Sequence, residues 1–250
     1  MARDASSYEV ASLTWDRVGE RLREDAPAIL PIGAGAKEHG LHMPMNADQV
    51  FAEHFAHVLA EMTDALIWPT LTYGFYPAFV AYAGSVSLSA ETFKALVTEI
   101  ADAILGFGVS RLFILDTGLS TIAPVDMAIK ASRDPSRIRH VPIFRGRRFL
   151  ATAHDLMQQP YGTHADEIET SLMLTIAPSR VDMARAKPSP LSTKGPTQGP
   201  LSRDDPTSPN YSPSGSFGDP TRASINKGSR LYAAILQDFS EAANTREVRL

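Results

Sequence analysis

Apolar residues along the chain follow two different spacings, which together predict a series of helices and buried strands. Short apolar runs, such as 26–32 and the part of 111–116 between Arg111 and Asp116, are typical of strands that are covered on both faces. Elsewhere apolar residues recur every three or four positions, which predicts amphipathic helices. The expected helices span 15–24, 47–62, 89–106, 125–132, 166–174 and 230–243, and the expected strands span 26–32, 65–71, 111–116 and 138–144.

The order of these elements predicts the fold class. Helices that alternate with buried strands indicate an α/β protein, a three-layer αβα arrangement with a mostly parallel sheet. A chain of 250 residues is expected to form a single domain. Residues 187–228 are rich in Pro, Gly, Ser and Thr, which by composition alone indicates a linker or loop. Because a helix is expected after them, we interpret them as an excursion between ordered elements.

Charge and cysteine content exclude several classes of function. The net charge is −4 and the basic residues are scattered, so we expect no nucleic-acid partner. The one basic cluster, Arg145, Arg147 and Arg148, adjoins an apolar run and is interpreted first as the solvated end of a strand, with a phosphate or carboxylate site as the alternative. The absence of cysteine excludes disulfides, thiolate metal sites and a cysteine nucleophile. No apolar run has the length of a membrane span, so we expect no membrane partner and a cytoplasmic location.

A polar loop follows the first expected strand. Ligands of open parallel sheets bind at the carboxyl ends of the strands. There, Lys37, Glu38, His39, His42 and Asp48 lie within twelve positions. Imidazole and carboxylate groups are ligands for zinc, manganese or iron where no thiolate exists. Spacing alone also allows a loop whose side chains only hydrogen-bond one another.

The run LPIGAGAKEHGLHMPMNAD, residues 30–48, resembles the signature of the creatininase (creatinine amidohydrolase) family. In that signature a strand leads to Glu-x-His-Gly-x-His-Leu-Pro and then to an Asp. Other similar segments follow in the family's order, among them HADEIETSLML at 164–174 and SGSFGDPTRASINKG at 214–228. The resemblance implies a creatininase-like fold for the whole chain, with residues 187–228 as an ordered loop of that fold.

The resemblance also implies a function and a set of site residues. It implies a metal-dependent hydrolase of a C–N bond in small amides, cyclic ones included, often with two metal ions. His39, Asp48 and Glu169 match metal ligands, and His164 matches a histidine beside the substrate that is suited to proton transfer. We expect zinc first, with manganese or iron as alternatives. The expected partners are a small-molecule substrate and further copies of the chain, in a homo-oligomer that could be a hexamer.

Two residues depart from the family pattern, and both fall on the same metal site. Lys37 stands where the family has a glutamate, and Gly118, in the loop 116–121, stands where it has a ligand histidine. Neither residue can ligate a divalent cation. One interpretation is that the Lys37 ammonium replaces the second cation beside Asp48, which leaves one metal and gives Lys37 a part in catalysis.

Two other interpretations remain open. The chain has one extra residue before His39 relative to the family spacing, and a bulge there could bring Glu38 into the place of the missing glutamate as a ligand. Alternatively, the protein is catalytically silent and binds a small carboxylate or amide metabolite in the same fold.

The remaining polar and aromatic residues receive more ordinary interpretations. His42, Ser120 and Thr121 are expected to contact the substrate, without a Ser-His-Asp arrangement that would make either hydroxyl a nucleophile. Two other histidines, His54 and His57, are expected in the core or an interface, and two more, His140 and His154, are expected on the surface. A stripe of aromatic residues is expected either to form the wall of a substrate pocket or to pack in the core or a subunit contact: Tyr73, Phe75, Tyr76, Phe79 and Tyr82.

Overall fold

The computed structural model describes residues 4–193 and 199–244, and its centre is a parallel sheet. The strands are β1 (Ala28–Ile32), β2 (Leu66–Ile67), β3 (Leu112–Asp116) and β4 (Ile138–Pro142), in the order β2-β1-β3-β4. β1 and β3 are direct neighbours, with Ile32 opposite Asp116. This confirms the predicted α/β fold with a mostly parallel sheet.

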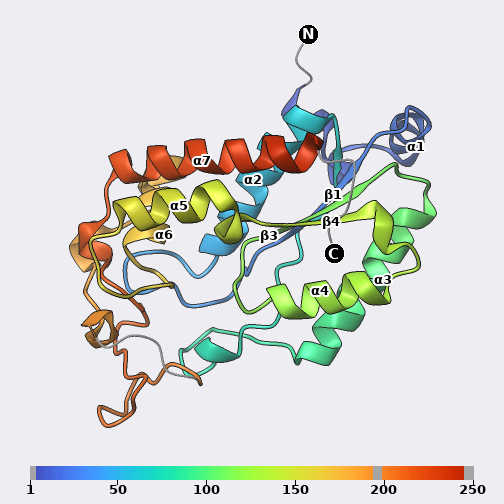
Figure 1. Ribbon diagram of the computed structural model, residues 1–250. Helices are drawn as coiled ribbons and strands as arrows, with labels where there is room; N and C mark the ends of the chain where they lie inside the picture. Colours follow the sequence, from blue (N-terminus) through green and yellow to red (C-terminus); the bar gives the residue numbers. More distant parts are fainter. Residues whose placement is uncertain (1–3, 194–198, 245–250) are drawn as a thin grey trace.

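Helices cover both faces of the sheet because its strands are apolar on both sides. Side chains such as Leu30 and Ile114 pack with one group of helices, and Ile29 and Phe113 pack with the other. Figure 1 shows α3 and α4 on one side of the sheet and α2, α5, α6 and α7 on the other. The helices are α1 (Trp15–Arg23), α2 (Ala47–Thr63), α3 (Ala90–Gly106), α4 (Ile122–Ala131), α5 (Arg147–Leu156), α6 (Glu167–Ile176) and α7 (Ile225–Asn244).

Two expected strands are shorter than the apolar pattern suggested. β2 keeps only two residues at the edge of the sheet, and beyond Pro69 its pairing with β1 continues only as an isolated bridge between Leu71 and Ile32. β4 ends at Pro142, and the chain then forms a 3₁₀ turn, Ile143–Arg145, and enters α5. The interpretation of the arginine cluster as a strand end is therefore wrong, and α5 was not predicted.

The described part of the Pro-rich excursion is folded. Leu191, Leu201 and Phe217 form a small apolar cluster with Tyr82, and Phe217 pairs with His164 in an antiparallel bridge. At Gly215 the excursion also packs against Glu38 in the polar loop after β1. Residues 194–198, which belong to the predicted excursion, lie outside the described residues.

Across the described ranges, none of the helices combines the length and apolarity that a bilayer crossing requires.

Candidate active site

Lys37 and Asp48 form a buried ion pair at the carboxyl end of β1. The loop after β1 carries Lys37, and Asp48 lies in the first turn of α2. The Lys37 Nζ atom lies 2.6 Å from Asp48 Oδ2, and the Asp48 side chain is fully buried. Burial by itself would raise the pKa of Asp48, but the charges of Lys37 and His39 outweigh it and hold that pKa well below its usual range. Asp48 is therefore ionised.

His39 lies between two acceptors. Its Nδ1 atom is 2.9 Å from the carbonyl oxygen of Lys37, and its Nε2 atom is 2.9 Å from Asp48 Oδ1. A neutral imidazole has only one N–H, so in that form one ring nitrogen directs its own lone pair at an acceptor oxygen. Either a second proton or a cation beside Nε2 and Oδ1 removes this conflict.

Glu38 holds His164 on the opposite side of the site. His164 Nε2 lies 2.8 Å from Glu38 Oε1 and 2.9 Å from the Glu38 carbonyl oxygen, so it donates to both. The other Glu38 oxygen accepts from the Gly40 N–H at 2.8 Å. Gly215, with φ +85°, passes so close that a Cβ there would run into the Glu38 carboxylate. These contacts leave His164 Nδ1 facing Glu169.

Glu169 enters the site from the first turn of α6. Asp166 caps this helix and accepts from the N–H groups of Ile168 and Glu169. Glu169 Oε2 accepts from the Ala165 N–H at 2.5 Å and lies 3.7 Å from His164 Nδ1. Ala165 has φ +46°, a left-handed conformation that costs free energy for a residue other than glycine. Burial, reinforced by Asp48 and opposed by His164, raises the pKa of Glu169 to about 7.

The resulting cluster fits a divalent cation. His39, His164 and Glu169 each offer a ligand atom within 4.8 Å of the others, and all three are buried. Asp48 adds an oxygen that already faces His39 Nε2. Histidine and carboxylate donors of this kind suit zinc and also manganese or iron. A cation between His39 Nε2 and Asp48 Oδ1 would accept the lone pairs of both atoms.

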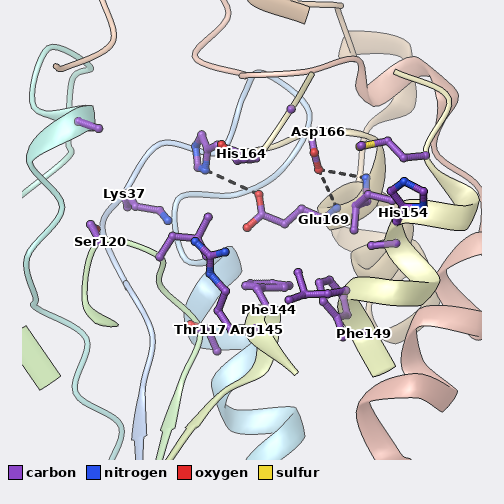
Figure 2. Close-up of a pocket in the computed structure, with 18 of the residues that line it drawn as sticks. Lys37, Thr117, Ser120, Phe144, Arg145, Phe149, His154, His164, Asp166 and Glu169 are labelled. Atoms are coloured by element: carbon purple, nitrogen blue, oxygen red, sulfur yellow. Dashed lines mark hydrogen bonds and ion pairs between the residues drawn. The ribbon is translucent and has the colours of Figure 1, made fainter. Parts of the chain in front are cut away.

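A pocket of about 560 Å³ opens beside this cluster. Lys37, His164 and Glu169 lie on its wall, and Ser120 lies beside Lys37. Figure 2 shows His164 and Glu169 pointing toward each other, with the aromatic rings of Phe144 and Phe149 further along the wall. This volume is in the range of small-molecule binding sites.

The structure separates the residues that were expected to contact the substrate. Ser120 lines the pocket, although its hydroxyl donates to the Phe75 carbonyl at 2.7 Å. Thr121 is buried outside the pocket lining, and its hydroxyl donates to Asp116. His42 is also outside the lining and contacts Thr170 at 2.8 Å. Burial lowers the pKa of His42 to about 4, with a further contribution from His39 and His164, so His42 is neutral near pH 7.

Gly118 leaves no room for a side chain. A Cβ at Gly118 would run into the Thr121 hydroxyl, and the Gly118 N–H donates to Asp116 Oδ1 at 2.9 Å. The loop after β3 is therefore closed where the family has a ligand histidine.

The structure bears on the two histidines that were expected on the surface, His140 and His154. His140 belongs to β4, where Nδ1 lies 2.8 Å from Asp126 and Nε2 lies 3.3 Å from Asp116. Its side chain is only 11% exposed, so the expectation of a surface residue is wrong. His154 is exposed as expected, and it also borders the pocket.

Other histidines and aromatic residues have structural contacts. His54 and His57, both in α2, contact Tyr232 and Glu9. Within the aromatic stripe, Phe79 lines the pocket and lies 4.9 Å below the Lys37 ammonium, measured to the ring centroid. Tyr76 and Tyr82 are buried.

Sequence reasoning did not place Phe144, Phe149 or Arg145 at the pocket, although it allowed a phosphate or carboxylate site at the basic cluster as an alternative. Arg145 follows β4, and Phe144 and Phe149 flank the turn into α5. The rule that ligands gather at carboxyl ends of strands could have drawn attention to Arg145, had the end of β4 been placed correctly. Asp166 was predicted only as the first residue of a helix, and its position before that helix is the usual signal of a cap.

The fold and the cluster define a three-layer α/β protein with a candidate cation site of histidines and carboxylates. A family model described as "Creatininase: Creatinine amidohydrolase" matches residues 11–243. The chain belongs to this family.

Individual relatives agree with that assignment. The chain is 25% identical to creatinine amidohydrolase from Pseudomonas putida, over 95% of this chain and 96% of the relative. It is also 25% identical to a mycofactocin precursor peptide peptidase from Mycobacterium ulcerans (strain Agy99), over 85% and 82%. A solved structure described as "Creatininase Mn" superposes with a TM-score of 0.79 at 24% identity, over 94% of this chain and 96% of that chain.

Proposed function

We propose that the protein is a metal-dependent hydrolase of a C–N bond in a small amide, cyclic amides included. The observation that supports this most is the convergence of His39, Asp48, His164 and Glu169 beside a pocket at the carboxyl edge of the sheet. The relatives named as an amidohydrolase and a peptidase both act on C–N bonds by their names. Substrate and metal identity belong to this proposal.

One cation per chain is the stoichiometry that the residues favour. Of the cluster, His39 and Glu169 would hold it together with Asp48, whose Oδ1 faces His39 Nε2, while His164, the third member of the cluster, would be kept for proton transfer. Zinc is the first choice for three such ligands with an open position. When bound, the cation would supply Lewis-acid activation of the amide carbonyl and of water. The Lys37 ammonium already balances the second Asp48 oxygen, and Gly118 offers no ligand.

The chain's own residues would then divide the remaining work. Lys37 keeps Asp48 ionised and adds positive charge at the pocket wall, where it stabilises charge that develops on the carbonyl oxygen. Glu38 fixes the orientation of His164 through Nε2. His164 would pass a proton from Nδ1 to the leaving nitrogen. Ser120, which lines the pocket beside Lys37, would contact the substrate.

A second candidate rests on the same two departures. If Lys37 and Gly118 abolish metal binding altogether, the protein binds a small carboxylate or amide without cleaving it. The two proposals differ in whether the protein needs a metal ion for its function.

A turnover assay separates the two. Wild-type protein is offered a panel of small linear and cyclic amides, creatinine among them, as purified, after EDTA treatment, and after resupply of zinc or manganese. We expect hydrolysis that EDTA abolishes and one metal restores. H57Q, which alters a histidine away from the pocket, serves as the control. If the metal-supplied protein cleaves no amide but binds one, the silent binding protein is the correct reading.

A further inference from the structure

Arg145 is the one arginine among the described pocket-lining residues, and it is not needed for the chemistry described above. It lies at the end of the turn that follows β4, at the edge of the sheet where the cation site also lies. Figure 2 shows its side chain pointing into the pocket from the end of that strand. The guanidinium group is therefore available to a bound molecule.

Arg145 differs from its neighbours in the basic cluster. Arg147 and Arg148 both pair with Glu241, at 3.1 Å and 3.2 Å. In the part of the chain that the structure describes, Arg145 has neither a carboxylate partner nor a hydrogen-bond acceptor for its side chain, and it is exposed. A guanidinium without an internal partner keeps its full capacity to bind an anion with two parallel hydrogen bonds.

The backbone that presents Arg145 is fixed. Asp238, from α7, accepts from the N–H groups of Arg148 and Phe149, both at 2.9 Å, and so caps the start of α5. A Cβ on Gly146 would run into the same carboxylate, so Gly146 packs directly against Asp238. The position of the Arg145 backbone beside the pocket thus follows from packing between two helices.

The other charges in the pocket do not cancel that of Arg145. The Lys37 charge is matched by Asp48. Asp166 caps α6 and accepts from Gln159 at 2.6 Å. Glu169 lies with His164 and would be neutralised by the cation. Arg145 therefore leaves a net positive charge at this end of the pocket, which favours an anionic group.

A large part of the pocket lining that Arg145 shares with the candidate cation site is apolar. Its side chains include Phe79, Phe144, Phe149, Leu150, Met157 and Ile168. A molecule that fills this space needs an apolar body, and its anionic group has to lie beside it. A carboxylate next to an apolar side chain has this composition, whereas a strongly hydrated compact anion would gain nothing from the wall.

We propose that Arg145 forms a carboxylate-binding subsite of this pocket, and that the substrates are amides with a carboxylate beside an apolar side chain, as in an N-acylated apolar amino acid. The inference rests on the proposed hydrolase function for the cleavage, but the subsite itself does not. In the cleavage, water supplies the oxygen that bonds to the acyl carbon, the C–N bond breaks, and the nitrogen takes up a proton and leaves as the free amino acid.

Binding measurements test the subsite without any need for turnover. The probes are N-acetyl-L-phenylalanine and its neutral carboxamide, titrated calorimetrically into the metal-supplied protein. For the wild type, we expect the acid to bind about tenfold to a hundredfold more tightly than the carboxamide. R145Q should remove this preference while leaving carboxamide binding unchanged, and R145K should keep part of it. R147Q, which alters an arginine paired with Glu241, should keep all of it.

The outcomes also distinguish this inference from the proposed function. Equal affinity for acid and carboxamide in the wild type, or an acid preference that survives in R145Q, would overturn the subsite. If amides are hydrolysed but the acid preference is absent, the hydrolase proposal stands and the subsite fails. If the preference depends on Arg145 but no amide is cleaved, the subsite stands and the hydrolase proposal fails.

Discussion

The ammonium nitrogen of Lys37 lies 2.6 Å from Oδ2 of Asp48, and neither side chain is more than 6% exposed. The resemblance to the creatininase family predicted this contact only as one of two options for the loop. The other option placed Glu38 against Asp48, but Glu38 contacts His164 instead. Lys37 therefore occupies the side of Asp48 that faces away from His39.

Removal of Lys37 should leave a buried charge without its partner. We expect K37M to lower the free energy of unfolding of metal-free protein by about 3–5 kcal/mol, because breaking one side of a buried pair costs that much. Urea denaturation measures this change. The double variant K37M/D48N should recover most of the loss, and K130M, at an exposed lysine, should change little. A K37M protein as stable as the wild type would contradict a charge-balancing role for Lys37.

Glu38 should act through His164 and leave metal binding intact. We expect E38Q to lower kcat by about tenfold to a hundredfold while metal content stays unchanged, since it weakens a contact that orients a functional histidine. E53Q, at an exposed glutamate of α2, is the control. Loss of metal from E38Q would instead make Glu38 a ligand, as the alternative reading of the loop proposed.

His140 should make a pH-dependent contribution to stability. Although burial opposes it, the hydrogen bonds to Asp116 and Asp126 raise the pKa of His140 above its ordinary value. A histidine whose pKa rises on folding adds stability that is complete below the unfolded-state pKa and is lost as pH rises through the folded-state pKa. H140N should therefore cost about 1.5–3 kcal/mol at pH 5.5 and clearly less at pH 9, measured by urea denaturation. An equal cost at both pH values would contradict the charged contact.

We also predict a homo-oligomer, with a hexamer as the specific expectation. Several large apolar side chains are exposed on the isolated chain, among them Trp15 at 88%, Val80 at 56% and Tyr73 at 55%. Apolar surface of this kind is typical of interaction sites when it is contiguous. Light scattering should give a multiple of 27.1 kDa, and a mass near 27.1 kDa at micromolar concentration would contradict the prediction.

The sequence predicted β1 and β3 well because both are buried and almost entirely apolar. The runs at 26–32 and 111–116 are apolar on both faces, and this pattern occurs only where helices cover both sides of a sheet. The turn after β4 was missed because Ile143 and Phe144 continue the apolar run of the strand, although they pack in a 3₁₀ turn. Helix α5 was also missed, because its first turn begins with two charged residues, Arg147 and Arg148, which were assigned to the end of the strand.

The site was predictable where its residues are close in sequence. Lys37, His39 and Asp48 form one loop, and their mutual contacts follow from its register. The contact between Glu38 and His164 joins residues 126 positions apart, and no local pattern specifies it. For Arg145 the sequence allowed an anion site only as an alternative, because its position at the pocket depends on how α5 and α7 pack.

The central claim is that a single cation binds to His39, Asp48 and Glu169, with His164 beside it. A measurement of metal content tests this claim most directly. Wild type, H39Q, H164Q and the control H57Q are purified in parallel, resupplied with zinc, and analysed by elemental mass spectrometry together with an amide-turnover assay. The account predicts about one zinc per chain in wild type, H164Q and H57Q, almost none in H39Q, and turnover in only wild type and H57Q. Two zinc ions per wild-type chain, or full zinc occupancy in H39Q, would contradict it.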